Sequence, residues 1–273
     1  MDYDTIKSWT FPRLTHRYSR DDTILYNLAI GFGADDLDYV WEDRLTAFPT
    51  LALVLATPGT WVADPATGID FGQAVHSEQR LDLFAPLPPE GELFGQARVT
   101  HVCDKGPSKG AIIVSENDLT DASGTLIART TQSVFCRGDG GLSASDPSPP
   151  SRPALPDRAP DATLSLTLPE NAAVLYRLTG DRNPLHVNPK VARAAGFDRP
   201  LLHGLCTLGQ VARVIAGHVG GQMTQLEARF SAPVFAGDAL TVDLWTQPNG
   251  VAFRARSATG AVVLNRGFAG FSL

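Results

Sequence analysis

The sequence contains little of what marks several large classes of protein. Its 273 residues include only three cysteines, Cys103, Cys136 and Cys206, which are scattered and odd in number. They form neither a disulfide framework nor a metal-binding spacing, so we expect a reducing compartment. No run approaches the roughly 18 consecutive apolar residues that a membrane-spanning helix needs. Residues 1–15 lack an apolar core, so we expect no secretory signal.

The sequence also lacks an excess of basic residues. Lysine and arginine number 23 against 29 acidic residues, which gives a net charge of -6. Proteins that bind nucleic acid or anionic membranes are usually basic, so neither partner is expected. An anionic small molecule stays compatible, because a few local cations can hold phosphates on an acidic protein. The 43% hydrophobic content is sufficient for a sizeable core.

Residues 138–161 differ from the rest of the chain. They are dense in glycine, proline, serine and aspartate, and they show neither helical nor strand periodicity. This composition favours an exposed linker. The alternative is a long surface loop inside one domain, although structureless loops of this length are uncommon in compact domains. We therefore predict two domains, residues 1–140 and 161–273, joined by a linker at 141–160.

The two flanking halves repeat one pattern. In each, an apolar run follows a proline, at residues 50–56 and at residues 201–215. The second run is long enough for a buried helix, and the first could open one. Each half then has an apolar strand, a turn with proline, a glycine–acid pair and further strands. A helix followed by antiparallel strands, written twice, is an α+β pattern. Chance recurrence of common turn residues is the alternative.

A short polar stretch carries candidate chemistry. Asp181 and His186 are five residues apart, with Asn183 and Pro184 between them. Proline fixes its own φ and restricts the residue before it, so the loop can be stiff. Such a loop can hold a carboxylate and an imidazole against one point for general acid–base work. The alternative is a tight turn in which the Asx side chains only cap the backbone.

Gly204 lies where the second apolar run begins. A backbone N–H at a helix N-terminus can stabilise a developing negative charge, and glycine lets a substrate oxygen approach closely. Gly204 is therefore the candidate oxyanion donor. For the adjacent His203 we expect a role in capping or packing at the start of the helix.

Residues 176–204, YRLTGDRNPLHVNPKVARAAGFDRPLLHG, resemble the hydratase-2 motif of the MaoC-like dehydratase family. The resemblance implies an α+β double hot-dog fold, with two antiparallel sheets that each wrap a central helix. It also implies that Asp181 and His186 activate a catalytic water, that Asn183 supports their loop, and that the Gly204 N–H binds the thioester oxygen. The implied reaction is reversible hydration of a trans-2-enoyl-CoA to the (R)-3-hydroxyacyl-CoA. Neither a metal nor an organic cofactor is implied, because CoA is part of the substrate.

The N-terminal half is similar to that of the family's two-hot-dog members, at residues 26–34, 48–50, 76–79 and 104–111. It lacks the Asp-x-Asn-Pro-x-His loop. The resemblance therefore implies a degenerate hot dog that accommodates the acyl tail, and one active site per chain. Ser77 stands where the family usually has glycine, and we assign no catalysis to the neighbouring His76.

Three cations are candidates to bind the CoA phosphates: Lys109, Lys105 and Arg199. The alternative is ordinary solvated surface charge. The C-terminus is not a peroxisomal tripeptide, which favours a cytoplasmic protein. A homodimer is a possibility, because hot dogs commonly pair through their sheets.

Other functions remain open from the sequence. One is a dehydratase for short dicarboxylic or branched CoA esters, for which Arg182 or Arg229 could reach the acyl pocket. A second is a thioesterase, since one fold hosts several chemistries. A third is a non-catalytic acyl-CoA-binding subunit, which the intact Asp181 and His186 loop disfavours.

Overall fold

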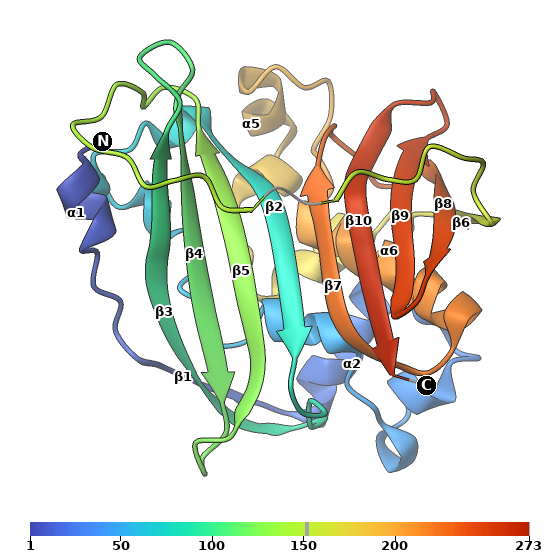
Figure 1. Cartoon of the computed structure of the whole chain (residues 1–273). Coiled ribbons are helices and arrows are strands. Elements are labelled where there is room, and N and C mark those ends of the chain that lie inside the picture. The colour runs from blue at the N-terminus through green and yellow to red at the C-terminus, as the bar shows by residue number, and fades with distance from the viewer. Residues whose placement is uncertain (151–152, 273) are drawn as a thin grey trace.

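The computed structural model describes residues 1–150 and 153–272. One antiparallel sheet of ten strands forms the front of the molecule in Figure 1, and most helices lie behind it. The strands are β1 (Leu14–Tyr18), β2 (Ala74–Leu83), β3 (Gly91–Asp104), β4 (Ala111–Thr120), β5 (Leu126–Cys136), β6 (Ala162–Thr167), β7 (Gln222–Phe230), β8 (Ala239–Gln247), β9 (Gly250–Ser257) and β10 (Val262–Ser272).

Except for α2 and α6, the described helices are short. The α-helices are α1 (Tyr3–Lys7), α2 (Arg20–Ala29), α3 (Leu37–Val40), α4 (Ala172–Tyr176), α5 (Pro189–Ala194) and α6 (Gly204–Val219). Single 3₁₀ turns are η1 (Glu42–Arg44), η2 (Pro49–Leu53), η3 (Trp61–Ala63), η4 (Pro65–Thr67), η5 (Phe71–Gln73), η6 (Arg177–Thr179) and η7 (Pro184–His186). Among the described helices, not one has the length and apolar content to cross a membrane.

The strand order shows how the two halves combine. It reads β1-β3-β4-β5-β2-β7-β10-β9-β8-β6, so all strands of the N-terminal half precede all strands of the C-terminal half. The halves meet where β2 pairs with β7, in a register that runs from Glu78 opposite Arg229 to Asp82 opposite Gln225. The predicted two sheets are therefore joined edge to edge into one continuous sheet.

The predicted repeat is present in the strands and uneven in the helices. The glycine–acid pairs Gly91-Glu92 and Gly237-Asp238 lie at the start of β3 and just before β8, as the pattern predicts. The second apolar run forms α6. The first apolar run forms only the 3₁₀ turn η2. The prediction that this run opens a central helix in the N-terminal half is therefore wrong. Ala56 has a positive φ of 43°, and a Thr-Pro-Gly sequence follows it, which stops a helix there.

Helix α6 packs against the N-terminal half as well as its own sheet. Its apolar face, which includes Leu208, Val211 and Ile215, is fully buried. At Gly209 the helix lies so close to Ile30 that an added Cβ would stand 2.7 Å from the Ile30 Cγ2. Arg213 Nε also donates to the Ile30 carbonyl oxygen at 3.2 Å. The missing side chain at Gly209 therefore permits the contact between the halves.

The segment predicted as a linker has no regular secondary structure in its described residues and crosses in front of the sheet in Figure 1. Asp146 holds one part of it. Its carboxylate accepts bonds from Lys7 Nζ at 2.7 Å and from the Val102 N–H at 2.8 Å, and its own N–H donates to the Val102 carbonyl at 2.9 Å. This part of the segment is thus fixed to the edge of β3 that β1 leaves unpaired. Residues 151–152 of the predicted linker lie outside the described residues.

The close approach at Gly209 generates a stability prediction. We expect Gly209→Ala to lower the free energy of unfolding by about 1–3 kcal/mol, because the new methyl group overlaps Ile30. Gly217, which is exposed on the same helix with no atom within 4 Å of its added Cβ, is the matched control. We expect Gly217→Ala to raise stability by up to about 1 kcal/mol through helix propensity. Urea unfolding midpoints measure both, and equal behaviour of the two variants would contradict the close contact.

Candidate active site

The loop from Tyr176 to Pro189 is held by its own side chains. Asp181 Oδ1 accepts a bond from the Asn183 N–H at 3.0 Å, and Asn183 Oδ1 accepts one from the Leu185 N–H at 3.0 Å. Gly180 begins the turn with a φ of 137°, a conformation that favours glycine. The capping turn and the stiff loop, which the sequence left as alternatives, therefore occur together. The turn holds Asp181 and His186 on one side of the loop.

Three side chains converge beside this loop. Asp181, His186 and His203 each place a nitrogen or carboxylate oxygen within 4.8 Å of the others. Asp181 is exposed, His186 is half-buried and His203 is only 2% exposed. The predicted pair is therefore brought together at a surface that a ligand can reach, and it is backed by a buried imidazole.

The hydrogen bond of His186 defines its neutral form. Its Nδ1 lies 3.0 Å from the Leu201 carbonyl oxygen. A carbonyl only accepts, so Nδ1 carries the proton and the neutral ring keeps its lone pair on Nε2. Burial lowers the pKa of His186, while the Leu201 bond and the Asp181 carboxylate act in the opposite direction. The ring is thus neutral at neutral pH, with a basic nitrogen available.

Gly204 begins α6 directly beside this cluster. The first N–H groups of a helix have no intrahelical acceptor, and Gly204 is exposed. An added Cβ at Gly204 would stand 3.1 Å from Cε1 of Phe230, so the Phe230 ring borders this position. The predicted oxyanion donor and the predicted acid–base pair therefore lie at the same end of the helix.

His76 reaches the site from the N-terminal half. A register shift between His76 and Glu78 marks a β-bulge in β2, and bulges commonly redirect side chains next to active sites. The His76 ring meets Phe230 edge-on with centroids 4.9 Å apart. Burial lowers the pKa of His76 to about 4, and the Asp181 carboxylate opposes that shift. His76, to which the sequence analysis assigned no catalysis, therefore lies beside Phe230 and close enough to Asp181 to be affected by its charge.

The Asp181, His186 and His203 cluster does not fit a shared metal ion. Imidazole lone pairs lie in the ring plane, and Zn–N bonds are about 2.0–2.1 Å. The rings of His186 and His203 are stacked, with centroids 3.8 Å apart and planes 28° from parallel. Planes so arranged do not meet on one ion at bonding distance. The absence of a metal cofactor remains a prediction from the family resemblance.

The cations predicted to bind CoA phosphates lie in different surroundings. Arg199 is already engaged, because it donates to the Asp238 carboxylate at 2.7 Å and to the Ala236 carbonyl at 3.0 Å. Lys105 donates to the Ser148 hydroxyl at 2.9 Å. Lys109 is exposed in the same β3–β4 turn. These contacts do not test the predicted role, so phosphate binding by Lys105, Lys109 or Arg199 stays a prediction.

The two arginines considered for a diacid substrate also differ. Arg229 and Phe230 are neighbours in β7, so their side chains point to opposite faces of the sheet. Phe230 borders Gly204, which places Arg229 on the outer face, away from the cluster. Arg182 is exposed in the loop between Asp181 and Asn183. Of the two, only Arg182 is close enough in the chain to meet a substrate group.

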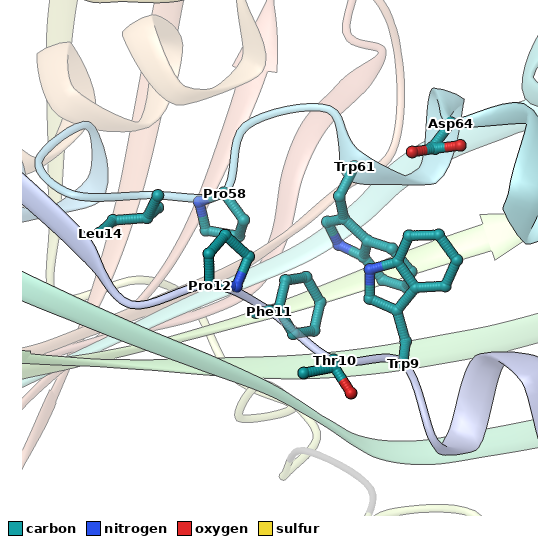
Figure 2. Close-up of a pocket in the computed structure, with 8 residues that line it drawn as sticks. All are labelled: Trp9, Thr10, Phe11, Pro12, Leu14, Pro58, Trp61 and Asp64. Carbon is teal, nitrogen blue, oxygen red and sulfur yellow. The ribbon is translucent and has the colours of Figure 1, made fainter.

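A separate pocket of about 320 Å³ lies near the start of the chain, and Figure 2 shows the aromatic side chains that line it. The Trp61 ring packs against Trp9 at 5.7 Å and against Phe11 at 5.0 Å between centroids. Asp64 is its one carboxylate, and no histidine lines it. This pocket offers no acid–base pair, so it does not compete with the cluster as the candidate active site.

Comparisons with known proteins identify the family of the chain. Residues 16–138 match the model of the MFE-2 hydratase 2 N-terminal domain, and residues 152–266 match that of the MaoC like domain. The chain is 37% identical to 3-hydroxyacyl-thioester dehydratase Y of Mycobacterium tuberculosis, over 94% of this chain and 92% of that protein. It is 35% identical to the enoyl-CoA hydratase ChsH3 of the same organism, over 90% of this chain and 89% of that protein.

Solved structures agree on the fold. A MaoC-like dehydratase from Phytophthora capsici superposes with a TM-score of 0.89 at 29% identity, over 100% of this chain and 99% of that one. A Mycobacterium tuberculosis protein described as a double hot dog aligns at 16% identity with a TM-score of 0.60, over 97% of this chain and 95% of that one. The predicted α+β double hot-dog class is confirmed, and the chain belongs to the MaoC-like, hydratase 2 family of hydro-lyases.

Proposed function

We propose that this protein hydrates trans-2-enoyl-CoA reversibly to the (R)-3-hydroxyacyl-CoA, with Asp181 and His186 as the catalytic pair. The observation that carries the proposal is their convergence within 4.8 Å beside the N-terminus of α6. Relatives named enoyl-CoA hydratase and 3-hydroxyacyl-thioester dehydratase support the substrate class. The stereochemistry, the preference for CoA over a carrier protein, the homodimer and the cytoplasmic location remain predictions.

The chemistry follows from the groups at hand. A water molecule held between the Asp181 carboxylate and His186 Nε2 gives a proton to the imidazole, and its oxygen attacks C3 of the enoyl group. The π electrons move toward the thioester and leave negative charge on its oxygen. The Gly204 N–H, at the positive end of α6, donates to that oxygen. The catalytic pair then returns one proton to C2, so that one water has been added across the double bond.

Asn183 has a supporting role in this proposal. Its side chain accepts from the Leu185 N–H, and its own N–H donates to the Asp181 carboxylate. It therefore sets the separation of the carboxylate and the imidazole without taking part in proton transfer. Small losses of such alignment are costly in rate, because reacting groups must be held close to the geometry of attack.

Loss of the conjugated enoyl-thioester absorbance tests the proposal. We expect the purified protein to consume a panel of 2-enoyl-CoAs, and Asp181→Asn and His186→Gln to lower kcat by at least about 100-fold. Asp198→Asn and His218→Gln make the same chemical changes at exposed positions and should keep wild-type rates. Folded Asp181 and His186 variants with undiminished rates would refute the assigned pair.

The same panel separates the other candidate functions. Monoacid and diacid CoA esters of matched length test whether the protein is a dehydratase for dicarboxylic substrates. The rates are compared in the wild type and in Arg182→Ala, because Arg182 is exposed beside Asp181. Release of free CoA thiol would indicate a thioesterase. Tight binding of enoyl-CoA without any turnover would indicate a binding subunit, and it would overturn the proposed reaction.

The pKa of His186 predicts the acid limb of the pH profile. The neutral ring is the working base, and burial holds its pKa below the ordinary value of 6.5. Protonation removes the Nε2 lone pair, so kcat should be level from about pH 8 down to the ordinary histidine value and fall only below it. Steady-state rates across this range measure the limb. A decline that begins above pH 7 would contradict a buried neutral base.

Gly204 predicts a steric effect on the oxyanion position. We expect Gly204→Ala to lower kcat/KM by roughly 10- to 100-fold, because the methyl group meets the Phe230 ring and narrows access to the amide. The free energy of unfolding should change little, since the helix propensity of alanine offsets the crowding against Phe230. Steady-state kinetics and urea unfolding give the two values. The Gly217→Ala control should leave kcat/KM unaltered, and an equal loss there would exclude a local effect.

A further inference from the structure

We infer that His203 is a positioning residue that holds Asp181 and His186 in a fixed position relative to each other. This role rests on the proposed function, in which Asp181 and His186 are the catalytic pair. It concerns a histidine for which the sequence predicted only capping or packing at the start of α6. His203 does occupy the N-cap position of α6, but its side chain makes no capping bond to that helix. It points instead toward the loop that carries the catalytic pair.

One contact of His203 fixes the backbone of Asp181. Its Nε2 lies 3.2 Å from the Asp181 carbonyl oxygen. The carbonyl only accepts, so Nε2 carries the proton and donates it. The loop is thereby tied to the first residue before α6, where Gly204 supplies the N–H. This single bond connects the carboxylate's residue to the helix terminus that binds the thioester oxygen.

A second contact fixes the ring of His186. The two imidazoles are stacked with centroids 3.8 Å apart, so one face of His186 is covered by His203. His186 is also anchored through Nδ1 to the Leu201 carbonyl. A ring that is held at one edge and covered on one face has little freedom to rotate. Its Nε2 lone pair is therefore held in one direction.

His203 is itself supported from behind by residues of both halves. Tyr176 of α4 lies on it with centroids 5.0 Å apart, and Tyr26 of α2 lies 5.9 Å from Tyr176. Both tyrosines are buried, and burial raises the pKa of each phenol, so both remain neutral. Four aromatic rings thus form a column from the N-terminal half to His186.

The neutral state of His203 suits this role. Burial lowers its pKa to about 4, and the nearby His186 adds to the effect, whereas Asp181 opposes it. Arg177 of η6 also disfavours a positive charge here, while Tyr176 is neutral and His76 of β2 is itself affected by the Asp181 charge. His203 therefore neither takes the proton meant for His186 nor places a charge beside it.

Two substitutions separate the contacts of His203. His203→Phe keeps a flat ring over His186 but removes the donor to Asp181. His203→Ala removes both, and it exposes the covered face of His186 to water. We expect both variants to lower kcat by roughly 10- to 100-fold with KM changed less than about threefold. Of these two variants, only His203→Ala should move the acid limb to higher pH, because a hydrated His186 returns toward its ordinary pKa.

A donor-retaining variant adds the opposite test. The amide of His203→Gln can still donate to the Asp181 carbonyl, but it offers no ring. We expect its kcat to lie above that of His203→Ala, with the acid limb displaced in the same direction. Thermal unfolding of each variant measures the folded fraction. Rates that fall only in proportion to that fraction, with the acid limb unmoved, would overturn the inference.

An NMR titration of the His186 ring keeps the inference separate from the proposed reaction. In labelled protein without substrate, the pKa of His186 should lie below 6.5 in the wild type and in His203→Phe, and it should rise in His203→Ala. If the wild type hydrates no enoyl-CoA, the proposed function fails while this result can still stand. An unchanged His186 pKa in His203→Ala would refute the positioning role even in an active hydratase.

Discussion

Helix α6 approaches the N-terminal half at Gly209, where a hydrogen replaces the side chain that would otherwise meet Ile30. Van der Waals packing at this point brings the helix and α2 together, and the Arg213 bond to the Ile30 carbonyl reinforces it. The N-terminus of the same helix carries Gly204, and its N-cap residue is His203. Packing between the halves at Gly209, five residues along the helix, thus helps to set the position of the proposed oxyanion donor.

The site brings together groups with opposite electrostatic needs. Asp181 is exposed and can remain charged, while His76, His186 and His203 are kept neutral by burial. His186 and His76 each bond a backbone carbonyl through one ring nitrogen, but only His186 lies in the cluster with Asp181 and His203. In the proposed reaction one carboxylate and one base therefore act among several imidazoles.

The sequence predicted the local parts of the site and missed the non-local ones. Asp181, Asn183 and His186 lie within six residues, and their turn depends on glycine, proline and Asx bonds that are readable from the sequence. His76 depends on a β-bulge and on the pairing of β2 with β7, across about 150 residues of chain, which no local pattern encodes. The motif that resembles the family indicated the candidate site, and only tertiary pairing adds His76 to its surroundings.

For the fold, too, the sequence predicted local elements but not their long-range pairing. Strand positions followed from turn residues, and α6 followed from a long apolar run. The apolar run at residues 50–56 was ambiguous, because a short apolar segment does not distinguish a helix from other buried structure. In the structure this run forms the 3₁₀ turn η2. The pairing of β2 with β7, which joins the two sheets, could not be predicted either, since it depends on which strand edges meet in space.

The β2–β7 pairing also settles where the sheet ends. The edge strands here are β1 and β6, each only five or six residues long, and the part of β3 beyond β1 is covered at Val102 by Asp146. Short edges offer little template for pairing with another chain, which limits aggregation. A catalytic half separated from its partner would instead expose β7, with a row of unpaired backbone groups between Gln225 and Arg229. Because both halves belong to one chain, β2 of the N-terminal half covers this edge of β7 permanently.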